Sequence, residues 1–187
     1  MKEASARDLG ALIAMARRNI GAPARLYLVG RTSHLAEHWR ERVPWFELAG
    51  DSGAIEMAVR EAAAALELAI VWESPADVIP LPAGWDQRAR PAPPDVVGAG
   101  GPLDALHFDP YSVVLRLIAR GDEPDYVAAL AYLRCGWVEP ARLEALLAEV
   151  LPRFTNETLA QDPAEFRRKF RGLRQLIAHD MGQPRPA

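Results

Sequence analysis

The sequence predicts an α+β fold in which a small sheet with helices is followed by a helical half. Short apolar runs closed by turn residues predict strands before residue 105. From residue 106 to 180, apolar residues recur at helical spacing between proline and glycine breaks. We therefore expect an α/β core at 1–105, with a Pro/Gly-rich excursion at 75–102, and a helical half at 106–180 that packs on it.

The first part begins with a helix, because Leu9, Leu12, Ile13 and Ala16 share one face at helical spacing. Apolar runs that end at a glycine or a turn predict the strands, and an Ala- and Glu-rich stretch predicts a later helix. The elements expected after the first helix are, in order, a strand at 25–29, a helix capped by Thr32 or Ser33 that carries Leu35 and Trp39, a strand at 46–49, a helix at 55–68 and a strand at 68–72.

The second part predicts helices whose starts and ends are set by proline and glycine. Pro110, Pro140 and Pro163 each follow an acidic residue, a pattern typical of a first helical turn. Gly121 and Gly136 are expected to end helices. The apolar periodicity places these helices around 111–118, 126–133, 143–150 and 166–177.

The composition is that of an ordinary soluble chain of 187 residues, half of them hydrophobic and a quarter charged. A net charge of −3 gives no general attraction to nucleic acid or to anionic membranes, so neither is an expected partner and an unknown protein partner stays open. The single cysteine, Cys135, cannot form an internal disulfide. With no apolar leader and no membrane-spanning run, the chain is predicted to be cytoplasmic.

The segment Gly30-Arg31-Thr32-Ser33 is the most informative in the chain, because it directly follows the apolar run at 26–29. A glycine between a strand and a helix lets backbone N–H groups approach phosphate oxygens. These residues are therefore the candidate nucleotide-binding residues.

Several further segments follow that turn in a characteristic order. They read SPADVIP at 74–80, PAGW at 82–85, HFDPYS at 107–112, GWVEPARL at 136–143 and DPAEFRRK at 162–169. Together with residues 26–33, this set resembles small bacterial nucleotidyltransferase-like proteins related to the AbiEii toxin type, over roughly residues 10–175. The resemblance implies a mixed sheet flanked by helices, a helical C-terminal half and a toxin–antitoxin-like setting.

Active members of that family are expected to move a nucleotide onto a hydroxyl of protein or RNA with Mg²⁺. Their chemistry needs carboxylates at i and i+2 of a strand, which point to one face and hold Mg²⁺ beside the nucleoside triphosphate. The resemblance places these two positions on Trp45 and Glu47, and a third carboxylate on Val71. It places a lysine of the helical half on Leu117, which leaves Asp125 as the polar residue there.

Apolar residues at most of these positions predict a catalytically degenerate protein that acts by binding a protein partner or a nucleotide. Such a protein is expected to need no cofactor and to hold no metal. The alternative is a divergent, active, toxin-like nucleotidyltransferase that modifies RNA or protein. It would use Glu47 as a metal ligand with Asp51 or Glu73, and it would need Mg²⁺ and a nucleoside triphosphate.

A third interpretation comes from His34, Glu37 and His38, which form the pattern H-x-x-E-H. On a helix, histidines at i and i+4 share a face and can bind Zn²⁺, with the glutamate as general base of a hydrolase. Two solvated histidines on a helix surface would have the same spacing. The pattern alone therefore does not distinguish a zinc site from two surface histidines.

The last predicted helix is strongly basic. An RNA or phosphate contact and a solvated helix face both fit this pattern, and the slightly negative net charge of the chain favours the solvated face. The basic residues are Arg167, Arg168, Lys169, Arg171 and Arg174.

Overall fold

The computed structural model describes residues 3–154 and 162–181 and shows an α+β protein. The chain divides into two compact units. Unit 1 comprises Met1–Ser74 and Gly84–Asp109, and unit 2 comprises Pro75–Ala83 and Pro110–Ala187. The predicted boundary at residue 105 would cut the strand Leu103–His107. The observed boundary after Asp109 keeps this strand whole in unit 1.

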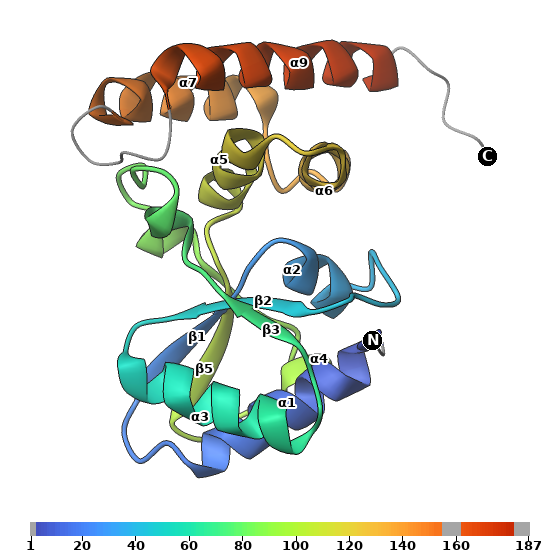
Figure 1. The fold of residues 1–187 in the computed structure, drawn as a ribbon, viewed down its shortest axis with the longest axis vertical. Helices are drawn as coiled ribbons and strands as arrows, with labels where there is room; N and C mark the ends of the chain where they lie inside the picture. Colours follow the sequence, from blue (N-terminus) through green and yellow to red (C-terminus); the bar gives the residue numbers. More distant parts are fainter. Residues whose placement is uncertain (1–2, 155–161, 182–187) are drawn as a thin grey trace. The chain divides into compact units, whose positions relative to one another are not determined.

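Unit 1 is built on a five-stranded mixed sheet (Figure 1). The strand order is β3-β2-β1-β5-β4. β1 pairs antiparallel with β2 and parallel with β5, so it lies at the centre of the sheet. β2 pairs parallel with β3, and β5 pairs antiparallel with β4. The strands are β1 at Ala24–Leu28, β2 at Phe46–Gly50, β3 at Ile70–Trp72, β4 at Arg90–Pro91 and β5 at Leu103–His107.

Two helices, α1 and α3, cover one face of this sheet, and α2 lies on the other side (Figure 1). Leu26, Leu28 and Leu48 alternate along β1 and β2 and belong to the apolar cluster under α1 and α3, which is the main core of unit 1. A capping box of Ser5 and Asp8 begins α1. The helices of unit 1 are α1 at Ala6–Arg18, α2 at Arg31–Ala36, α3 at Gly53–Ala65 and α4 at Pro94–Val97.

The structure corrects two of the predicted helices. Gly30, not Thr32 or Ser33, is the N-cap residue of α2. That helix ends at Ala36, so Trp39 is not part of it. α3 ends at Ala65 instead of continuing to residue 68, because the chain turns through Glu67, whose φ is 55°. The first helix and the strands at 25–29 and 46–49 are confirmed to within a residue or so at each strand end.

Strand β5 was not predicted from the sequence. It follows the Pro/Gly-rich excursion and pairs with β1 from Ala24↔Leu103 to Leu28↔His107. Leu103 and Ala105 point into the core, and Asp104 between them is exposed. A five-residue strand of this composition depends on its distant partner, since little in its own residues favours extended structure.

The Pro/Gly-rich excursion contains only short regular elements, as expected, and its second part is anchored within unit 1. Trp85 stacks on Phe108 with ring centroids 4.8 Å apart and planes 5° apart. The Arg88 guanidinium donates from Nε and Nη2 to the two carboxylate oxygens of buried Asp109, each at 2.9 Å. Such bidentate pairs fix orientation as well as distance, so the segment from Trp85 to Arg88 is held against the two residues that follow β5.

Unit 2 contains the predicted helices. Each begins with a proline in its first turn, where the missing N–H group costs nothing. Rings of Phe154 and Phe166, 4.9 Å apart, pack in its core. The first part of the excursion belongs here, because Arg153 donates to the Leu81 carbonyl oxygen at 2.9 Å. The helices are α5 at Pro110–Arg120, α6 at Glu123–Arg134, α7 at Pro140–Val150 and α9 at Pro163–Met181.

In the described parts of the chain, no helix is both long enough and apolar enough to cross a bilayer.

Gly10 provides a test of the packing of α1. A Cβ atom added there would lie 2.5 Å from the carbonyl oxygen of Val96, which is part of α4. A Gly→Ala change inside a helix ordinarily stabilises by about 1 kcal/mol. Here the overlap with a backbone atom forces the segments apart, so Gly10→Ala is expected to lower the free energy of unfolding in urea by about 1–3 kcal/mol.

Gly53→Ala is the matched control, because a Cβ atom on Gly53 of α3 meets nothing within 4 Å. Its free energy of unfolding is expected to be unchanged or slightly higher. A Gly10→Ala protein as stable as the control would contradict the close contact between α1 and α4.

Candidate functional site

The turn between β1 and α2 depends on Gly30. Its φ of 53° and ψ of −120° lie in a region that residues with a Cβ atom rarely adopt. The chain can therefore leave β1 and enter α2 directly, and the four predicted nucleotide-binding residues do form one strand–turn–helix connection.

Glu47 binds this turn from the neighbouring strand. The Arg31 N–H group donates to Oε2 of Glu47 at 3.0 Å. The Glu47 N–H group donates to the Thr32 hydroxyl oxygen at 2.7 Å, and the Val29 N–H group donates to the Glu47 carbonyl oxygen at 3.0 Å. Glu47 is 1% exposed. One buried residue of β2 thus makes hydrogen bonds through its N–H, its carbonyl and its carboxylate to the chain around the turn.

The remaining hydroxyl of the turn is also engaged within the protein. Ser33 is buried and donates from Oγ to the Leu28 carbonyl oxygen at 3.0 Å. The Glu47 carboxylate accepts the N–H of Arg31, the first residue of α2. A bound anion at the N-terminus of this helix would otherwise accept that N–H. Two donors that a phosphate could use, the Arg31 N–H group and the Ser33 hydroxyl, are therefore bonded to the chain itself.

Two of the positions where the resemblance implies metal-binding carboxylates are apolar in character. Trp45 lies just before β2, and the Arg31 guanidinium carbon is 5.6 Å from the centre of its ring, a cation–π contact. Val71 pairs with Glu47 in the β2–β3 register and is 37% exposed. Neither side chain can ligate Mg²⁺, which needs oxygen ligands.

The structure does not bring Asp51 to Glu47. Asp51 lies beyond the opposite end of β2, where its Oδ2 accepts from the Arg25 N–H at 3.2 Å. Four residues along a strand rise about 13 Å, too far for two carboxylates to share one ion. Glu73 lies two positions after Val71 and therefore on the same sheet face as Glu47, with its N–H group bonded to the Leu48 carbonyl at 3.0 Å.

In unit 2, the positions implied for the helical half have structural contacts. Leu117 is buried in α5. Asp125 is buried in the first turn of α6, where both of its carboxylate oxygens accept from Arg120 at 2.9 and 3.0 Å. Asp125 therefore orients the chain between α5 and α6.

The predicted zinc face of His34 and His38 is not formed. α2 ends at Ala36, and His38 adopts a φ of 58°, which turns it away from the helical path. His34 is 3% exposed and packs 5.2 Å from the ring of Trp39, whereas the side chain of His38 is largely exposed and lies 4.0 Å from Asp95. The two imidazoles thus lie in different environments instead of sharing a helix face.

Glu37 instead pairs with His107 at the end of β5. Glu37 Oε1 lies 2.9 Å from Nε2 of His107, which is 1% exposed. Burial lowers the pKa of His107 to about 4, and the Arg90 charge adds to the effect. Burial also raises the pKa of Glu37. With His107 neutral, the contact is a hydrogen bond from Nε2–H to the carboxylate. The sequence holds no local signal for it, because 70 positions separate the two residues.

His34 belongs to the same region of unit 1. Burial lowers its pKa to about 3, with smaller contributions from the positive charges of Arg40 and Arg31 and from His107 once it is protonated at low pH. Two neutral, buried imidazoles therefore lie near the carboxyl ends of β1 and β5. Among the described residues, no group of three or more His, Cys, Asp or Glu side chains is placed to hold a metal ion.

Comparisons of the chain with protein-family models, with curated proteins and with solved structures find no match. The relation to nucleotidyltransferase-like proteins thus remains a prediction from the sequence segments.

Removal of the Glu47 carboxylate is expected to destabilise the protein. Glu47→Ala leaves the partly buried Arg31 N–H at the helix start without its acceptor, so the free energy of unfolding should fall by about 2–3 kcal/mol. Glu61→Ala, on the exposed side of α3, should change it by less than about 0.5 kcal/mol. Equal stabilities in urea titrations would show that Glu47 does not support the turn.

The buried histidines predict a dependence of stability on pH. In the folded protein His34 and His107 bind protons only near pH 3 and pH 4, whereas in the unfolded chain they do so near pH 6.5. The unfolded state therefore binds more protons between these values. The free energy of unfolding should fall as pH is lowered from 6.5 toward 4, by up to about 1.4 kcal/mol per pH unit for each histidine.

Urea titrations across this pH range measure the effect. His34→Gln and His107→Gln should each reduce the slope, while His38→Gln should not, because His38 is exposed. A slope that is the same in all of these variants would assign the acid sensitivity to other groups.

Proposed function

We propose that this protein is a catalytically degenerate relative of nucleotidyltransferases that acts by binding a protein partner. The observation that carries the proposal is the buried Glu47 carboxylate, which accepts the N–H of Arg31 at the turn where a nucleotide phosphate would be held. A phosphate would have to displace a carboxylate from a desolvated site, and like charges there would repel one another.

The environment of Glu47 supports the same conclusion. A two-carboxylate Mg²⁺ site needs oxygen ligands close together in octahedral geometry. Next to Glu47 the chain places the ring of Trp45, in contact with Arg31, and the side chain of Val71. Since the Arg31 N–H group and the Ser33 hydroxyl already donate to acceptors within the protein, a protein partner is favoured over a nucleotide as the ligand.

The alternative, a divergent active transferase, would have to use Glu47 with Glu73, which share a sheet face. For this chemistry Glu47 would have to leave the Arg31 N–H group and hold Mg²⁺ beside a nucleoside triphosphate. The two functions therefore differ in the role of Glu47: in one it accepts the Arg31 N–H, and in the other it binds Mg²⁺. A substitution of Glu47 can distinguish them.

The test is incubation of the protein with Mg²⁺ and each α-labelled ribonucleoside triphosphate, with tRNA, a protein mixture or the protein itself as acceptor. We expect no transfer of label and no heat of nucleotide binding by calorimetry. Glu47→Gln is the decisive variant, because it keeps an oxygen acceptor for Arg31 but removes the charge that Mg²⁺ requires. Label transfer that is lost in Glu47→Gln and kept in Glu61→Gln would overturn the proposal.

A further inference from the structure

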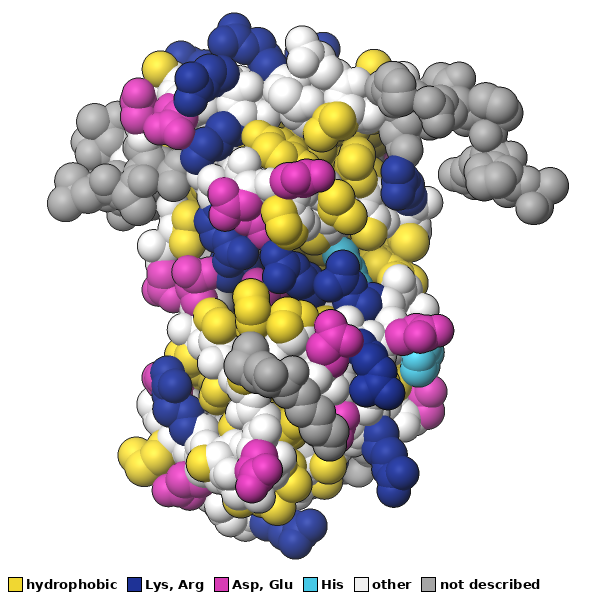
Figure 2. Space-filling model, turned by 45° about the vertical axis from the view of Figure 1, so that its right-hand side comes forward, with side chains coloured by type: hydrophobic (Ala, Val, Ile, Leu, Met, Phe, Trp, Pro, Cys, Tyr) yellow, Lys and Arg dark blue, Asp and Glu magenta, His cyan; other side chains and the backbone are white. Residues whose placement is uncertain are grey.

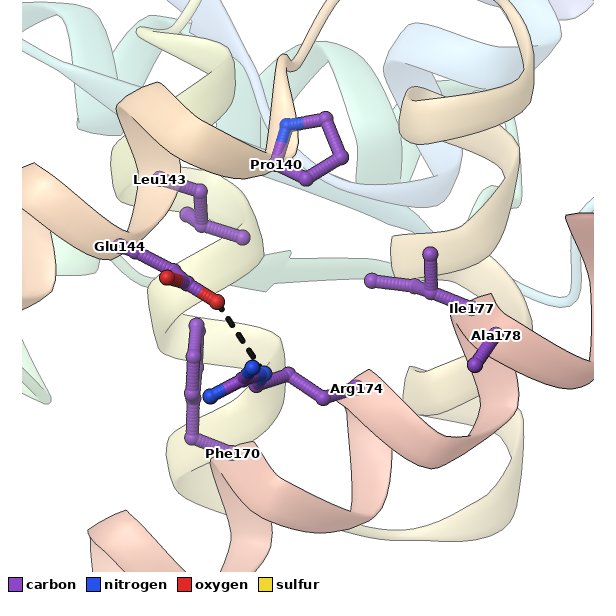
Figure 3. A pocket seen from close by; sticks show the side chains of 7 residues that line it. All are labelled: Pro140, Leu143, Glu144, Phe170, Arg174, Ile177 and Ala178. Carbon is purple, nitrogen blue, oxygen red and sulfur yellow. Dashed lines mark ion pairs between the residues drawn. The ribbon is translucent and has the colours of Figure 1, made fainter.

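Unit 2 contains a groove between α7 and α9 (Figure 3). Its volume is about 140 Å³, comparable with cavities of about 150 Å³ that accept a benzene molecule. The groove therefore has room for one large apolar side chain. It is lined by Pro140, Leu143, Glu144, Phe170, Arg174, Ile177 and Ala178.

The inner wall of the groove is apolar and belongs to the core. Leu143 and Phe170 are buried, so the helix positions that form the wall are fixed by packing. Glu144 and Arg174 face each other across the opening, with 3.1 Å between Oε1 and Nε (Figure 3). Their side chains are 47% and 61% exposed, so solvent screens the pair and its opening costs little.

One border of the groove is strongly basic. Arg167, Arg171, Arg174 and Ala178 follow one another at spacings of three and four along α9 and so form a single stripe beside the groove. Between Glu165 and Ala178 the helix carries five Lys or Arg residues and one acidic residue. Figure 2 shows Lys and Arg side chains gathered over α9 at the top of the view. This concentration contrasts with the net charge of −3 of the whole chain.

We infer that the groove is the docking site of an acidic amphipathic helix from a partner protein. An apolar residue of the partner enters the groove, and its Asp and Glu residues on the adjacent face pair with Arg171 and Arg174. Helices that dock into apolar grooves place their apolar anchor residues three or four positions apart, on one face. Charge complementarity at the border of the groove then selects the partner. The inference rests on the proposed binding function and names the surface and the chemistry of the partner.

A nucleic acid would account for the basic stripe but not for the apolar groove beside it. Phosphate contacts need only the arginines, whereas the groove offers an apolar wall to a side chain. The co-location of the two features on α9 thus favours a peptide with both apolar and acidic residues.

The experiment titrates the full-length protein against a fluorescent peptide of about 15 residues, long enough to be stabilised as a helix by an internal cross-link. The peptide carries Leu at helical spacing on one face and Glu on the flanks. A matched peptide has Lys in place of each Glu, and a single-stranded RNA oligonucleotide serves as competitor. Ala178→Trp fills the groove from an exposed position, and Arg171→Glu reverses the charge of its border.

Each variant has a control on the same helix. Arg168→Glu makes the same charge change at a position further round α9, next to Glu165, and Gln175→Trp adds the same ring outside the groove. Circular dichroism melting curves establish that all variants are folded. Ala178→Trp and Arg171→Glu should each weaken the acidic peptide at least about tenfold, while the controls change its dissociation constant by less than about twofold.

Three results would overturn the inference: no binding of the acidic peptide, equal binding of the Lys peptide, or equal losses in the variants and their controls. Displacement of the peptide by RNA at lower concentration than by unlabelled peptide would also overturn it and would assign the stripe to nucleic acid. None of these results involves transfer of a nucleotide, so the docking inference and the degenerate function can fail separately.

Discussion

The hydrogen bonds of Glu47 hold the centre of unit 1 together. Through its N–H, carbonyl and carboxylate groups, this residue connects β2 to the end of β1 and to the first turn of α2. A buried carboxylate is stable only while its oxygens accept hydrogen bonds. The same bonds that stabilise the turn also occupy it. The bonds that connect β2 to α2 thus also occupy the Arg31 N–H group, so a change that frees this group must weaken the fold.

Much of the secondary structure could be predicted from local features of the sequence. The face of α1 follows from the spacing of Leu9, Leu12, Ile13 and Ala16, which all prove to be buried. Prolines mark the starts of the unit 2 helices, because a missing N–H group costs nothing in the first turn. Gly30 supplies the positive φ that the turn needs, and the apolar run before it forms β1 as expected. Such features depend on neighbours within a few residues.

The parts that could not be predicted depend on contacts between distant segments. β5 extends because β1 is beside it, since its own Leu, Asp, Ala and His residues have little preference for a strand. The pairing of Glu37 with His107 spans 70 positions, and the short H-x-x-E-H pattern pointed instead to a zinc site that the end of α2 at Ala36 prevents. The neighbours of Glu47 in the sequence predict that it lies in a strand. They do not predict that its carboxylate accepts the Arg31 N–H, because this contact depends on where α2 lies.

The two edge strands of the sheet have a consequence for how unit 1 can contact other chains. β3 is three residues long, and β4 is two residues long and contains Pro91, which has no N–H group to offer. Short edge strands and an edge proline are poor templates for a further strand. The charge of Arg90, beside Pro91, also opposes pairing with another strand. Edge-to-edge aggregation and recognition by strand addition are therefore both disfavoured at these two edges of unit 1.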